Sequence, residues 1–123
     1  MELALYLAAA ATLAIGIAHS YMGERYLLMR LFRREDLPKL FGSTDYTRRT
    51  LRFAWHVTTV AWWGFGALLV LLAHPPVSAQ AVGMVIGAVF LLHFAIALFG
   101  SRGRHYSWVA FLVIGVLATW ATR

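Results

Sequence analysis

Four long apolar runs occupy most of this 123-residue chain. They cover residues 3–22, 51–73, 79–100 and 106–121. About 20 mainly apolar residues are enough for a helix to cross the hydrocarbon core of a bilayer. Hydrophobic residues make up 61% of the chain, more than a soluble domain of this size could bury. The sequence therefore predicts one all-α integral membrane domain over residues 1–123, folded as a four-helix transmembrane bundle.

The basic residues predict how the chain is oriented. The first connection and its margins hold eight of them, and Arg102 and Arg104 lie between the third and fourth runs. The connection over residues 74–78 has no Lys or Arg. Because Lys and Arg concentrate in cytoplasmic loops, both basic loops are expected in the cytoplasm and both termini outside, as in a bacterial inner-membrane protein. The net charge of +6 is thus a topology signal, and we expect no nucleic-acid partner.

The segment over residues 24–42 is amphipathic. Its apolar side chains fall on one arc of a helical wheel and its arginines on the rest, which predicts either a helix at the inner interface or an extension of the first span. The arginines would attract anionic lipid headgroups. Pro38 and Gly42 break the helical pattern. The next helix is expected to begin near Thr44 and Asp45, because Ser, Thr and Asp favour helix N-termini.

Four histidines are placed at the same side of the predicted membrane domain. His19 and His93 lie near the ends of the first and third runs, while His56 and His105 lie near the starts of the second and fourth. Antiparallel spans bring these positions to the cytoplasmic side. Ionisable residues at membrane depth are costly and usually functional. His56 and His93 are the best-matched pair, about 8 and 10 Å below the interface at the helical rise of about 1.5 Å per residue.

The surroundings of His56 favour haem b over a bare metal ion. Asp45, Arg49, Arg52 and His56 are spaced i, i+4, i+7, i+11 and form one helix stripe. Arg102 and Arg104 are expected at the same level. Arginine repels a cation but pairs with carboxylates such as haem propionates. The leading hypothesis is a redox centre with His56 and His93 as axial ligands and Arg49, Arg52, Arg102 or Arg104 at the propionates.

Two other functions are compatible with the sequence. A transition-metal site for Fe, Cu or Zn could use His19, His56, His93 and His105, with Glu24 as a fifth candidate. However, Glu24 lies about 140° around the helix from His19, and pairing with neighbouring basic residues such as Arg25 is expected instead. The third hypothesis is a cofactor-free accessory subunit or scaffold of a larger membrane complex. The sequence assigns no reaction, substrate or electron partner.

Small residues predict helix contacts. Gly16 and the alanines of the first run would allow close packing, and Gly83 and Gly87 form a GxxxG spacing that could mark a homo-oligomer contact. Thr12, Thr58 and Thr59 can bond to carbonyls of their own helices. The chain has no cysteine, which excludes disulfides, thiolate metal sites and cysteine nucleophiles.

Overall fold

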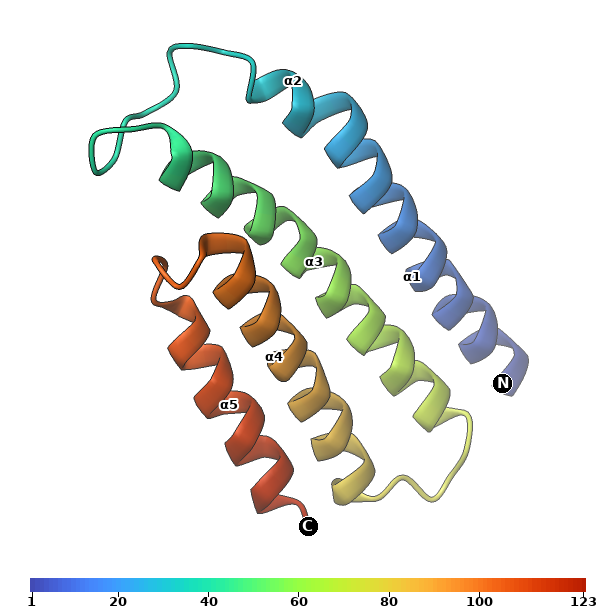
Figure 1. The fold of residues 1–123 in the computed structure, drawn as a ribbon. Helices are drawn as coiled ribbons and strands as arrows, with labels where there is room; N and C mark the ends of the chain where they lie inside the picture. The colour runs from blue at the N-terminus through green and yellow to red at the C-terminus, as the bar shows by residue number, and fades with distance from the viewer.

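A computed structural model describes all of residues 1–123 and contains four long helices and no strand (Figure 1). The first helix comprises α1 (Glu2–Met22), a π-helical segment (Gly23–Leu28) and the short α2 (Met29–Leu31). It is followed by α3 (Asp45–Leu72), α4 (Ala79–Ser101) and α5 (Ser107–Ala121). The all-α prediction is confirmed.

Three of the helices are long and apolar enough to cross a membrane: the first helix over Glu2–Leu31, α3 and α4. The predicted fourth span is shorter, because α5 has only 15 residues. At about 1.5 Å per residue it extends about 22 Å, less than the roughly 30 Å of a bilayer's hydrocarbon core.

The amphipathic segment is an extension of the first helix rather than a separate helix. The helical backbone continues without a break from α1 to Leu31, and residues 34–44 form a loop. The helical part of the predicted 24–42 segment is therefore shorter than expected. The two leucines Leu27 and Leu28, which belong to the predicted apolar arc, differ: Leu28 is buried whereas Leu27 is exposed. Helix α3 begins at Asp45, as predicted, and the Asp45 backbone N–H donates to Ser43 Oγ (3.3 Å).

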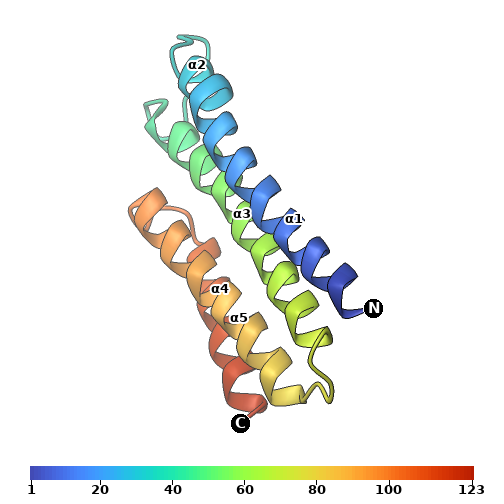
Figure 2. The same ribbon diagram turned by 90° about the vertical axis from the view of Figure 1, so that its right-hand side faces the viewer.

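The helices form an open bundle. Helix α1 packs on α3, α3 on α4 and α4 on α5, and no contact joins α1 to α4 or α5 (Figures 1 and 2). Short connections make consecutive helices antiparallel, and both termini lie at the same end. A closed four-helix bundle would bring the first and last helices together. The predicted bundle is therefore correct in helix number and direction, but it is not closed.

Small residues provide the close contacts between helices, as predicted for the first run. A Cβ atom at Gly16 would overlap the indole of Trp63, and one at Gly23 would overlap that of Trp55. These two glycines let α3 approach the first helix closely.

The GxxxG spacing has a different use from the predicted one. A side chain at Gly83 would overlap Thr122, and one at Gly87 would overlap Thr119. The two glycines are buried against α5 of the same chain. Their close contact is thus made within the chain, and formation of a homo-oligomer stays a prediction.

Candidate functional site

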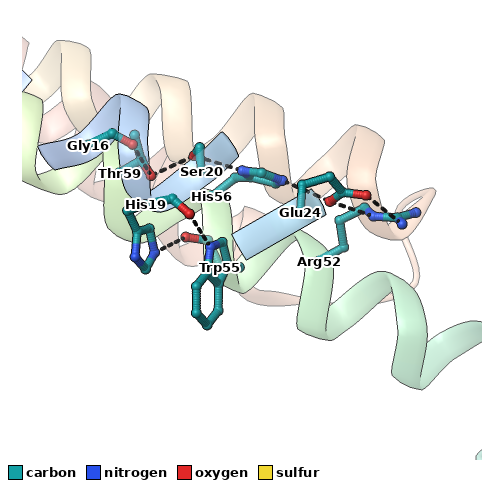
Figure 3. Close-up of polar contacts among 8 residues, drawn as sticks. All are labelled: Gly16, His19, Ser20, Glu24, Arg52, Trp55, His56 and Thr59. Atoms are coloured by element: carbon teal, nitrogen blue, oxygen red, sulfur yellow. Dashed lines mark hydrogen bonds and ion pairs between the residues drawn. The ribbon is translucent and has the colours of Figure 1, made fainter. Parts of the chain in front are cut away.

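A chain of polar side chains crosses the contact between the first helix and α3 (Figure 3). Glu24 forms an ion pair with Arg52 (Oε1 to Nη2, 2.8 Å) and approaches Nε2 of His56 at 3.4 Å. Nδ1 of His56 lies 2.9 Å from the Ser20 hydroxyl. We call Ser20, Glu24, Arg52, His56 and Thr59 the polar seam. Glu24 was expected to pair with neighbours on its own helix such as Arg25; it pairs instead with two residues of α3.

The inner end of the polar seam is formed by two hydroxyl groups. Ser20 Oγ lies 2.7 Å from Oγ1 of Thr59, which donates a 3.5 Å hydrogen bond to the carbonyl of Gly16. Thr59 was expected to bond within its own helix, as Thr58 does with the carbonyl of Ala54. It bonds across the helix contact because Gly16 brings the two backbones close together there.

Helical periodicity explains why these residues meet. Gly16, Ser20 and Glu24 are spaced i, i+4, i+8 and share one face of the first helix, while Arg52, His56 and Thr59 form an i, i+4, i+7 stripe on α3. Each stripe is visible in the sequence. Their facing one another is not, because it depends on how each helix is rotated about its axis.

His19 lies beside the polar seam but outside it. Its Nε2 lies 3.3 Å from the carbonyl of Trp55, whose indole Nε1 donates to the carbonyl of His19 at 3.0 Å. The two rings are stacked, with centroids 4.3 Å apart. This reciprocal pair packs the helices together and uses the polar atoms of His19 within the protein.

Next to the polar seam is a cavity of about 540 Å³, which we call the arginine cavity. Its charged lining residues all come from the first turns of α3, and Phe32, Phe53 and Ile96 form apolar walls. Three guanidinium groups and one carboxylate give this lining a net charge of +2. The full set of lining residues is Phe32, Asp45, Arg48, Arg49, Arg52, Phe53, His56, Ile96 and Gly100. The predicted stripe of Asp45, Arg49, Arg52 and His56 is thus confirmed.

Sequence reasoning missed Arg48. Its spacing from Asp45 and Arg52 is i+3 and i−4, so the helical wheel already placed it on the same face. Its Nε is buried and has no hydrogen-bond partner in the protein. Arg48 is therefore the cavity arginine with the clearest capacity to bind an anion.

The other arginines at this end are largely paired. Asp45 accepts two hydrogen bonds from Nε of Arg49 (2.9 and 3.0 Å) and lies 3.7 Å from Arg104. These contacts tie the start of α3 to the loop before α5. Arg102 is exposed and does not line the cavity. Of the four arginines expected at propionates, Arg49 and Arg52 line the cavity. Arg104 does not line it, but it contacts the lining residue Asp45.

His93 and His105 do not line the arginine cavity. His93 is 5% exposed and lines a second cavity, in which its ring packs near Phe90 and Phe111. His105 bonds to the hydroxyl of Ser107 (2.8 Å). His56 and His93 line different cavities, so they do not form the facing pair that was expected. Glu24 and His56 are in contact, but no three of the His, Asp and Glu side chains are grouped as metal ligands, so His19, His56, His93, His105 and Glu24 do not form one site.

A separate basic cluster lies on the exposed side of the first helix. Arg25, Arg30 and Arg33 surround a shallow depression together with Tyr26 and Met29. This position is outside the arginine cavity. Contact between this cluster and anionic lipid headgroups stays a prediction.

Comparison with protein-family models, curated proteins and solved structures found no significant match for this chain.

Proposed function

We propose that this chain is a small integral membrane protein that binds an anionic amphipathic group in the arginine cavity, and that this group is haem b serving a redox role. The observation that carries the proposal is the composition of the cavity wall. Arg48, Arg49 and Arg52 line it together with Phe32, Phe53 and Ile96, and the guanidinium of Arg52 lies over the ring of Phe32. Arginine binds carboxylates through paired, charge-assisted hydrogen bonds, whereas the apolar wall suits the body of the ligand.

The dimensions also support a cofactor-sized ligand. Small-molecule sites usually enclose about 300–1,000 Å³ and combine an apolar lining with a few polar groups. The arginine cavity, at about 540 Å³, falls in this range. Arg48 contributes a buried Nε without a protein partner, and burying such a donor unpaired costs free energy. An anionic ligand would satisfy that donor.

The residues fit haem b with one histidine ligand rather than two. His56 is the only histidine that lines the arginine cavity, and His93 lies in another one. Both ring nitrogens of His56 have protein partners, but the contact of Nε2 with Glu24 is long at 3.4 Å. Nε2 is therefore the nitrogen that could be released to a ligand. Bound haem would supply one-electron chemistry, while Arg48 and Arg49 would hold its carboxylates.

A specific observation supports a second candidate, the cofactor-free accessory subunit. Glu24 and Asp45 form ion pairs with three of the basic groups at this end, namely Arg52, Arg49 and Arg104. His19, His56 and His105 each have hydrogen-bond partners within the protein. In this interpretation the polar seam fastens the first helix to α3, because interhelical hydrogen bonds stabilise helix pairs in membranes. The open bundle would leave helix faces for the other subunits.

An absorption spectrum with elemental analysis distinguishes the functions. We expect protein purified from haem-supplied cells to show a Soret band that is lost in His56→Ala and retained in His93→Ala. Arg48→Gln should lower the haem-to-protein ratio, whereas Arg25→Gln, on the exposed basic cluster, should leave it unchanged. Stoichiometric Fe, Cu or Zn without a Soret band would support the transition-metal alternative. Protein with neither, in spite of supplied haem and metals, would refute both and favour the accessory subunit.

A further inference from the structure

A second cavity lies between α3 and α4, deep in the apolar part of the chain. It is open to the surface, has a volume of about 190 Å³ and is lined by Ala61, Gly64, Phe65, Leu68, Val85, Ile86, Val89, Phe90 and His93. We call it the His93 cavity. Every lining residue except His93 is apolar or glycine. A cavity of this kind needs a ligand that is apolar over nearly all of its surface.

His93 gives this cavity one polar group. His93 is 5% exposed, and its buried Nε2 makes no hydrogen bond of normal geometry within the protein, although the ring lies near the backbone of Val57. Buried polar side-chain atoms nearly always have a partner, and the lipid around the helices supplies none. His93 is the only one of the five histidines in this position, because the other four have hydrogen-bonded ring nitrogens.

The size and walls of the cavity limit the ligand. An apolar cavity of about 150 Å³ is large enough for benzene, so 190 Å³ accommodates one six-membered ring with a small substituent. Phe65 and Phe90 can pack against an aromatic ring in offset or edge-to-face geometry. Phe65 and Ile86 are also exposed on the surface of the chain. They form a rim through which a molecule dissolved in the bilayer could enter.

We propose that the His93 cavity binds a lipid-soluble ring compound that carries one hydrogen-bonding oxygen, and that Nε2 of His93 binds this oxygen. A neutral imidazole nitrogen either donates or accepts according to its tautomer, so a phenolic hydroxyl and a ring carbonyl are both suitable. This site is independent of the arginine cavity, since the two share no lining residue.

The test compares two ligands that differ only in the polar atom. The protein is labelled with ¹⁵N-histidine, placed in lipid nanodiscs without haem, and titrated with 4-methylphenol or with 4-methyltoluene. The phenol should shift the Nε2 resonance of His93 saturably, and it should bind about ten-fold more tightly than the toluene, as expected when a buried polar atom gains its partner. The His93 resonance is identified by its absence from His93→Phe.

Two variants complete the experiment. Ala61→Leu fills the cavity and should abolish the saturable shift, while Leu92→Ala, at an exposed position beside His93, should leave it intact. A wild-type protein with no saturable shift would overturn the proposal, as would a shift that persists in Ala61→Leu or equal binding of the two ligands. None of these results depends on a Soret band, so this site and the haem site can fail separately.

Discussion

At the scale of the residue, Ser20 is the group that the polar seam depends on most. Its one hydroxyl contacts both Nδ1 of His56 and the hydroxyl of Thr59, so its loss leaves two polar atoms on α3 without this partner. Nothing in the sequence around Ser20 marks it as different from other serines in apolar helices.

We predict that Ser20→Ala lowers the free energy of unfolding by about 1 kcal/mol, the net value of a hydrogen bond in a protein or a membrane helix pair. The matched control is Thr58→Ala, because the hydroxyl of Thr58 bonds only to Ala54 of its own helix. That variant should change stability by less than about 0.5 kcal/mol. Reversible unfolding in detergent measures the free energy of unfolding of both variants. Equal losses in the two variants would show that the hydroxyl of Ser20 stabilises the fold no more than a hydroxyl bonded within its own helix.

At the scale of the element, the sequence marks α4 as a helix but does not indicate which of its faces meets a neighbour. Apolar side chains lie all round this helix, so no polar face distinguishes the buried side. The shape of the α4 surface determines instead which face packs against α5. Gly83 and Gly87 make a groove that receives Thr119 of α5 and Thr122, the residue just after this helix, which is the small-residue packing known from membrane helices.

We predict that Gly83→Ile combined with Gly87→Ile destabilises the fold by about 2 kcal/mol or more, because added carbons would overlap α5. The mass of the particle in detergent should not change. Met84→Ile with Ala88→Ile repeats the same spacing at exposed positions and should be nearly neutral. If the glycine variant instead dissociated an oligomer while the chain kept its stability, the contact with α5 would be wrong.

At the scale of the whole molecule, the two basic connections lie at one end and the termini at the other (Figure 1). Three helices are long enough to span a bilayer. The charge distribution then predicts that the end with the arginine cavity faces the cytoplasm. The cavity would lie where a soluble electron donor or an anionic ligand could reach it from that side.

We predict that a membrane-impermeant maleimide added outside cells labels the Val77→Cys variant but not Lys39→Cys. Both positions are exposed, and the chain has no cysteine of its own. After the membrane is permeabilised, both variants should be labelled, which is the control for reactivity. Labelling of Lys39→Cys alone in intact cells would reverse the orientation and place the arginine cavity outside.

The helices, and the residues that share a helix face, could be predicted from the amino-acid sequence. The α4 boundaries match the predicted span within one residue, the start of α3 at Asp45 was expected, and the stripe from Asp45 to His56 lines one cavity. These features are local, because backbone hydrogen bonding in lipid requires a helix and the helical repeat fixes which positions align.

The packing of the helix faces against one another could not be predicted from the sequence and is seen only in the folded chain. It joined Ser20 and Glu24 to His56, placed His93 in another cavity, turned the GxxxG groove towards α5 and left the bundle open. The physical reason is that helices in lipid are apolar on nearly every side, so hydrophobicity does not fix their rotation. Close packing of glycines against bulky side chains far away in the sequence fixes it instead, as Gly16 does with Trp63 and Gly23 with Trp55.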